Sequence, residues 1–158
     1  MANQVKNEVK VEIAELLKPI LADQFVLYQK ARNYHWNVTG DMFYTLHQAF
    51  EDLYTELAAD IDEVAERIRA LGVKSPGTIN ELVQLSGLKD EQAATYPDQL
   101  AMVNNLINDL EFLSISLHTS GDKIEGELED RVTVDLLNGL AAKYEKTVWM
   151  MKSLVEGK

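Results

Sequence analysis

Long helical segments are the feature that most limits how this chain can fold. Apolar residues recur with a period near 3.6 along most of the sequence, and only three prolines and eight glycines interrupt the pattern. The pattern predicts long helices at about 7–38, 43–71, 99–121 and from 130 or 133 to 155, with a short helix at about 79–86. Pro19 should kink the first helix or divide off a leading piece. The predicted fold class is therefore all-α.

Local signals support the predicted helix ends. Gly40 suits the position just after a helix, where a left-handed backbone is common. Thr78, followed three residues later by Glu81, matches a capping box. Asp98 can begin the next long helix as its N-cap.

The connection at residues 72–97 is unusually long. It holds about 26 residues, whereas most connections in compact domains hold about 4–6. It can run back along the second helix, which would be roughly 43 Å long at about 1.5 Å per residue. One long crossover is the ferritin-like arrangement. We expect a ferritin-like four-helix bundle with a short extra helix in the long connection, as a single domain over residues 1–158, with a short flexible tail at about residues 1–8.

Composition excludes several classes of function. The absence of cysteine excludes disulfides, thiolate catalysis, Fe–S clusters and cysteine zinc sites. The sequence has no apolar run of membrane-spanning length and no secretory type of start, so we expect a cytoplasmic protein without a membrane partner. A formal net charge of −11 repels nucleic-acid phosphates and attracts cations.

Two pairs of metal-capable side chains lie on the predicted second helix. His47 with Glu51, and Asp62 with Glu66, are each spaced by four residues, so the members of a pair project from one face. Glu51 and Asp62 are separated by roughly 16 Å along the axis, while first-shell metal bonds are only about 2.0–2.3 Å long. One straight helix therefore cannot close a single site from both pairs.

A second copy of the helix, antiparallel about a two-fold axis, would place Asp62 and Glu66 opposite His47 and Glu51 twice over. His35 is the natural fifth ligand, because a tight turn separates it from His47. Imidazole and carboxylate ligands together suit iron (Fe2+/Fe3+), although zinc or another divalent ion could use the same ligands. None of the histidines has glutamate three residues before it, which disfavours an ordinary di-iron centre inside the bundle.

Simpler interpretations remain open for these residues. Glu63 with Arg67 and Glu66 with Arg69 could form surface salt bridges. His35 could be a buried, hydrogen-bonded histidine. Trp36 could take electrons or radicals from adjacent iron chemistry or simply close the turn.

An acidic cluster precedes and begins the last helix: Glu125, Glu127, Glu129, Asp130 and Asp135. It could be a solvated face whose carboxylates favour the helix dipole, or an acidic ring that draws cations through a pore on a symmetry axis.

Several segments together resemble one family. They are residues 34–40 (YHWNVTG), 46–47 (LH), 50–51 (FE), 62–72 (DEVAERIRALG), 135–137 (DLL) and 144–150 (YEKTVWM). This combination, spread over nearly the whole chain, resembles the Dps family, the mini-ferritins named as DNA-binding proteins from starved cells.

The resemblance implies a hollow homo-dodecamer with ferroxidase sites at its two-fold interfaces. In such proteins Fe(II) is oxidised, preferentially by hydrogen peroxide, and stored as a ferric mineral, which protects the cell and its DNA from oxidative damage. The implied ligands are His35, His47 and Glu51, with Asp62 and Glu66 from the two-fold mate. Many members have aspartate in place of Glu51, so that residue could bind directly or through water.

The resemblance also bears on the pore and on DNA. Asp135 matches the acidic three-fold pore position, with Asp130 as a further pore residue. Strong DNA binders in the family carry a Lys/Arg-rich tail, whereas residues 1–10 here hold Lys6 and Lys10 against Glu8. We therefore expect DNA binding to be weak or absent and the location to be cytoplasmic, with nucleoid association as the alternative.

Three functions compete at this stage. The leading one is a ferroxidase with an iron-storage role. The second is a shell that coats DNA and uses the metal sites structurally. The third is an inert helical bundle with salt-bridged faces.

Overall fold

The computed structural model describes residues 2–157, with side chains from Lys6 onward, and this part of the chain contains helices and no strands. The elements, in chain order, are α1 (Ala2–Asn37), α2 (Phe43–Ala70), α3 (Ile79–Leu85), α4 (Gln99–Lys123), the π-helical turn η1 (Ile124–Leu128) and α5 (Arg131–Val155).

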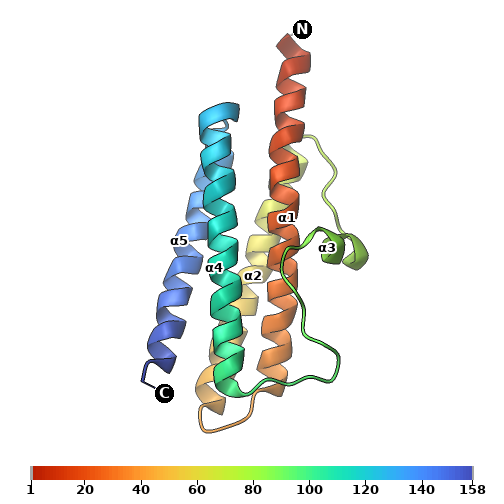
Figure 1. Ribbon diagram of the computed structural model, residues 1–158. Coiled ribbons are helices and arrows are strands. Elements are labelled where there is room, and N and C mark those ends of the chain that lie inside the picture. The colour runs from red at the N-terminus through yellow and green to blue at the C-terminus, as the bar shows by residue number, and fades with distance from the viewer. Residues whose placement is uncertain (1, 158) are drawn as a thin grey trace.

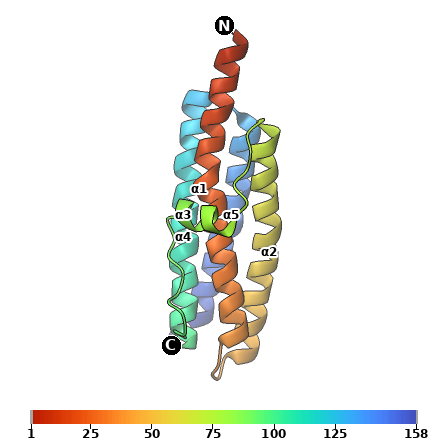
Figure 2. The same cartoon turned by 90° about the vertical axis from the view of Figure 1, so that its right-hand side faces the viewer.

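Four long helices form an elongated bundle (Figure 1). The tight turn after α1 makes α2 antiparallel to it, and α4 and α5 form a second antiparallel pair. The long connection returns from one end of the bundle to the other, so α2 and α4 run in the same direction, and α3 lies against the outside of α1 (Figure 2). The expected ferritin-like four-helix bundle with one crossover is confirmed. No helix between residues 2 and 157 is both long and apolar enough to span a bilayer.

The predicted helix limits agree closely with the structure. Thr78 and Glu81 form both bonds of the capping box at the start of α3, and Asp98 accepts a hydrogen bond from the Ala101 N–H at 2.9 Å at the start of α4. The π-helical turn was not foreseen. It ends at Glu129, whose φ of 56° lies in the left-handed region.

The first helix differs from expectation at its beginning and at Pro19. It runs without a break through Pro19, which is exposed, so the carbonyl that loses its backbone partner can bind water. Residues 2–8, expected to form a tail, belong to α1 in the structure, and their flexibility in solution stays a prediction.

Apolar residues at helical spacing make the core. On α2 the buried side chains recur every three or four residues along one stripe, which faces α1 and the interior. They are Leu46, Phe50, Leu53, Leu57, Asp60, Val64 and Ile68, all apolar except Asp60. The large fully buried rings of Tyr34 and Tyr144 pack among them from α1 and α5.

Buried polar side chains fasten the crossover to the bundle. The Lys30 ammonium donates to the Lys89 carbonyl at 2.7 Å and to the Asp109 carboxylate at 2.6 Å. Asp23, almost fully buried, accepts from the Gly87 N–H at 2.7 Å and from the Ser86 hydroxyl at 2.7 Å. Because these groups would be costly to bury without partners, they hold the segment after α3 in one position on α1 and α4.

A second fastening lies beside the end of α1. The Tyr34 hydroxyl donates to Glu91 in the crossover and accepts from the Asn105 amide of α4 at 2.9 Å. Burial first, and then the Glu91 carboxylate, raise the pKa of Tyr34 well above its ordinary value, so the hydroxyl keeps its proton.

The turn between α1 and α2 needs a glycine and a partner from α4. Gly40 has a φ of 123°, and its carbonyl accepts from the Phe43 N–H at 3.2 Å. The Gln99 side chain accepts from the Met42 N–H at 3.1 Å and donates to Asp41. A Cβ at residue 40 would meet the Gln99 carboxamide carbon at 2.7 Å, so alanine would displace the end of the Gln99 side chain as well as strain the backbone.

Gly40→Ala is therefore expected to lower the free energy of unfolding by about 1–3 kcal/mol, the range for an unfavourable backbone conformation. Equilibrium urea denaturation measures it. Gly77→Ala is the matched control, because a Cβ there meets nothing within 4 Å. Equal effects of the two substitutions would contradict the role of the turn.

Candidate metal centre

His35 and His47 come together across the turn. His35 lies in the last turn of α1, and His47 lies in the second turn of α2. Their rings stack with centroids 3.8 Å apart and an interplanar angle of 18°. The predicted approach of the two histidines is therefore present within one chain.

Each histidine is oriented by the backbone of the other. The Nδ1 of His35 lies 2.7 Å from the His47 carbonyl oxygen, and the Nδ1 of His47 lies 2.9 Å from the His35 carbonyl oxygen. A carbonyl can only accept, so each Nδ1 must carry the proton and donate it. Each neutral ring then presents its Nε2 lone pair, the form in which imidazole binds a metal ion.

Aromatic rings enclose the pair. Tyr54 contacts His35 edge-on, with centroids 5.3 Å apart, and Phe43 stacks on His47 with centroids 5.1 Å apart. Tyr54 lies seven residues after His47 and Phe43 four residues before it, so helical periodicity already placed both near that face of α2. These contacts restrict the ring positions before any ligand binds.

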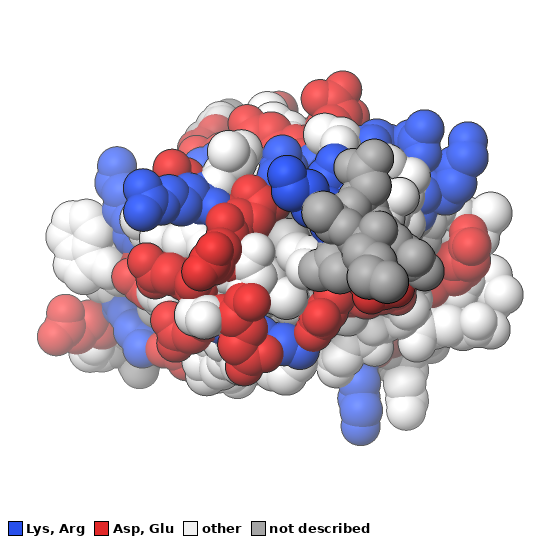
Figure 3. Space-filling model, turned by 90° about the horizontal axis from the view of Figure 1, so that it is seen from above, with Lys and Arg blue, Asp and Glu red and all other residues white. Residues whose placement is uncertain are grey.

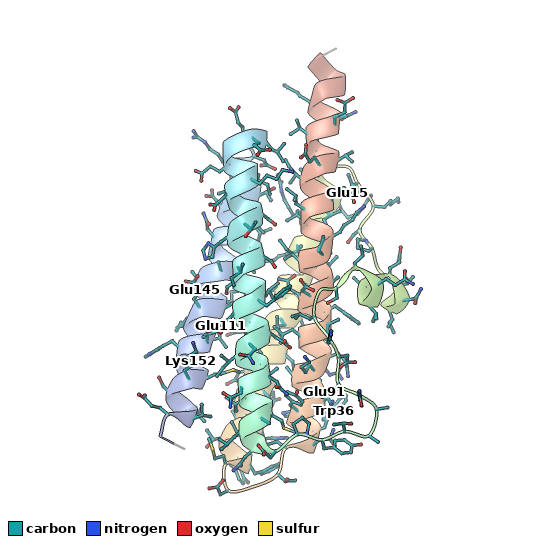
Figure 4. The ribbon with its side chains drawn as sticks, in the orientation of Figure 1. Glu15, Trp36, Glu91, Glu111, Glu145 and Lys152 are labelled. Carbon is teal, nitrogen blue, oxygen red and sulfur yellow. The ribbon has the colours of Figure 1, made fainter. Side chains whose placement is uncertain are left out.

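Arg32 lies beside this aromatic group. Its guanidinium carbon is 4.9 Å from the Trp36 ring centroid and 5.9 Å from that of Tyr54, and it donates to the Tyr28 hydroxyl at 3.0 Å. Trp36 is 57% exposed and packs on Arg32 near the end of α1 (Figure 4). The electron-transfer role considered for Trp36 stays a prediction.

The carboxylates do not join the histidines in one chain. Glu51 is half-buried one turn after His47, while Asp62 and Glu66 are exposed farther along α2. Among the described side chains, no three His, Asp or Glu residues gather closely enough to hold a metal ion. A single chain thus supplies two oriented imidazoles, while the carboxylates of Asp62 and Glu66 do not join them in one site.

Glu51 also borders a groove. The cavity, of about 470 Å³, lies between α2 and the end of α5, and its lining includes Asp52, Glu56 and Met150.

The two residues expected at a pore have different settings. Asp130 caps α5: it accepts from the Thr133 N–H at 3.3 Å and pairs with Arg67 at 2.6 Å. Burial alone would raise the pKa of Asp130, but hydrogen bonds from Thr133 and Arg67 outweigh it and lower the pKa below its ordinary value. Asp135 is exposed in the first turns of α5.

The whole acidic cluster lies at one end of the bundle. Glu125, Glu127 and Glu129 are exposed there around η1, and acidic side chains cover much of this end (Figure 3). The pore assignment of Asp130 and Asp135 stays a prediction, and the Asp130 carboxylate already has two protein partners.

The histidine geometry makes a sharp spectroscopic prediction. In a long-range ¹H–¹⁵N correlation spectrum of the neutral rings, both His35 and His47 should carry their proton at Nδ1 and not at Nε2. His118 is the internal control, because its Nε2 contacts the Glu145 carboxylate at 2.7 Å and so carries a proton. An Nε2–H signal from His35 or His47 would refute the reciprocal arrangement.

Comparisons with known proteins identify the family of the chain. A model of the ferritin-like domain matches residues 14–157. The chain is 38% identical over 144 residues to "DNA protection during starvation protein 2" of Bacillus anthracis, covering 91% of this chain and 97% of that one.

Solved structures give the same result. A Dps protein from Bacillus brevis superposes with a TM-score of 0.89 at 35% identity, covering 94% of this chain and 98% of that one. The Dps protein of Vibrio cholerae O1, described as a ferritin-like diiron-carboxylate protein, gives 0.89 at 28% identity, covering 95% and 92%. With a domain match over most of its length and close relatives of this kind, the chain belongs to the Dps family of ferritin-like proteins.

Proposed function

We propose that the protein is a ferroxidase that oxidises Fe(II) with hydrogen peroxide at sites shared between two chains, and that it stores the ferric product inside a hollow shell of twelve chains. Membership of the Dps family supports this proposal, as does the description of the Vibrio relative as a diiron-carboxylate protein. The observation that carries it is the pair of imidazoles whose Nδ1 atoms each donate to the other's backbone carbonyl, which leaves both Nε2 atoms free of that bond.

The proposed ligands of each site come from two chains, because one chain does not bring all of them together. His35, His47 and Glu51 form one half of each site, and Asp62 and Glu66 of a two-fold mate form the other half. Exposure of Asp62 and Glu66 on α2 makes them available to a second chain. Because a two-fold interface repeats every contact, one pair of chains would hold two identical sites.

The chemistry uses iron as substrate. Two Fe(II) ions give one electron each to hydrogen peroxide, the O–O bond breaks, and two protons complete two water molecules. Imidazole and carboxylate ligands with open positions suit this oxidation. Taking both electrons in one event removes peroxide without releasing a hydroxyl radical. The acidic groove beside Glu51 then offers oxygen ligands to the ferric product.

Mixing two inactive variants tests the shared site. His35→Ala/His47→Ala and Asp62→Ala/Glu66→Ala should each slow peroxide-dependent Fe(II) oxidation by at least about tenfold, the smaller effect known for weakening a metal site. Hybrids assembled from both variants should regain oxidation, because one of the two sites at each mixed interface has all its ligands. Glu63→Ala, an exposed carboxylate on the same helix, is the control and should leave the rate unchanged.

The outcome separates two geometries. If the hybrids stay as inactive as their parents, the ligands all belong to one chain and the shared site is wrong. If the histidine variant oxidises iron at the normal rate, the ligand assignment is wrong.

A DNA-coating function is the second candidate, and it is favoured by the name of the Bacillus anthracis relative, a DNA protection during starvation protein. The net charge of −11 argues against strong phosphate binding, and residues 1–10 offer only two lysines to oppose it. In a gel-shift assay at low salt without divalent cations, we expect little retardation of duplex DNA. Strong, salt-sensitive retardation would reverse the ranking of the two functions.

A further inference from the structure

A buried polar cluster lies inside the bundle, apart from the histidine pair. Asp60 of α2 and Gln24 of α1 are fully buried, and Tyr144 of α5 is 1% exposed. The Gln24 amide donates to the Tyr144 hydroxyl at 2.8 Å, and the Asp60 carboxylate binds the Lys143 ammonium. Three helices therefore bring oxygen atoms to one place in an otherwise apolar core.

Two of these oxygens have no hydrogen-bond partner. They are Oδ2 of Asp60 and Oε1 of Gln24, both acceptors. Buried acceptors are nearly always satisfied by a donor or an ion, because leaving them bare is costly. After burial, the Asp60 charge also raises the pKa of Tyr144, the residue next to Lys143 on α5, well above its ordinary value. The cluster is thus rich in acceptor oxygen, and the Asp60 charge is balanced by the Lys143 ammonium.

Lys143 supplies the positive charge from the surface side. Its side chain is 41% exposed, whereas that of Asp60 is 0% exposed, so the lysine reaches inward from solvent. Burial would lower the pKa of Lys143, but Asp60, and then Glu63 and Glu56, raise it, so the ammonium persists. Glu56 and Glu63 are exposed, which gives the approach to this point an acidic character.

We propose that Asp60, Gln24 and Tyr144 form a cation position inside the bundle, that the Lys143 ammonium fills it, and that this lysine keeps divalent ions out of the interior. The donor set consists of oxygen atoms only, which suits a hard cation such as Mn(II) or Mg(II). A cation at this position would take the place of the lysine charge opposite Asp60. The proposal deepens the proposed function, since it explains why iron chemistry would be confined to the interface.

The test counts Mn(II) ions bound by the otherwise unchanged full-length protein, using the electron paramagnetic resonance signal of free Mn(II). Lys143→Met keeps most of the side-chain volume and removes the charge. It should bind one Mn(II) per chain more than the unchanged protein does. The double variant Lys143→Met/Asp60→Asn should lose this ion. Lys146→Met, which removes an exposed lysine on the same helix, should bind no additional ion.

Each outcome of this test either supports or overturns the proposal. A folded Lys143→Met protein without the additional ion overturns the proposal, as does anomalous density for Mn(II) beside Asp60 in crystals of the unchanged protein. If Lys143→Met folds only when Mn(II) is present, the ion replaces the missing charge and the proposal holds. Failure to fold under both conditions overturns it. Because Mn(II) binding is counted without any oxidation, the result is independent of the proposed ferroxidase activity.

Discussion

The exchange of hydrogen bonds between two histidines and each other's backbone is the constraint on which the candidate site depends. It requires the end of α1 and the start of α2 to lie at a fixed separation, so the bonds of 2.7 and 2.9 Å join the two helices as well as orienting the rings. The turn at Gly40 makes that separation possible, and Gln99 of α4 holds the turn closed. The geometry of the turn and the orientation of the two histidine rings are therefore one feature of the molecule.

Much of the fold could be predicted because its signals are local. Apolar spacing fixed the limits of α2 within one residue, and the side chains of Thr78 and Asp98 act as caps where expected. Pro19 shows the limit of a local rule, since an exposed proline is tolerated within a helix whose residues on both sides of it, such as Leu17 and Ile20, are buried. The long crossover could be predicted from the length of the connection alone. The polar contacts of Lys30 and Asp23 that hold it on the bundle could not be predicted in this way.

The candidate site was predictable only in part. The sequence spacing predicted that His35 lies near His47 and that Asp62 lies far from both. These conclusions require only the position of the turn and the rise per residue of a helix. The ring orientation depends on side-chain rotamers, which spacing does not determine. The pairing of Asp60 with Lys143 links helices far apart in the sequence, and nothing in either local pattern indicates the partner.

The separation of the proposed ligands along α2 has a consequence for when the protein can react with iron. On the proposed function, a newly made chain carries half of each reaction centre and is inert toward iron until it meets another. Its reactivity would then rise with its own concentration, so synthesis and assembly would act as the switch. Dispersed single chains would never generate ferric product where no shell exists to contain it.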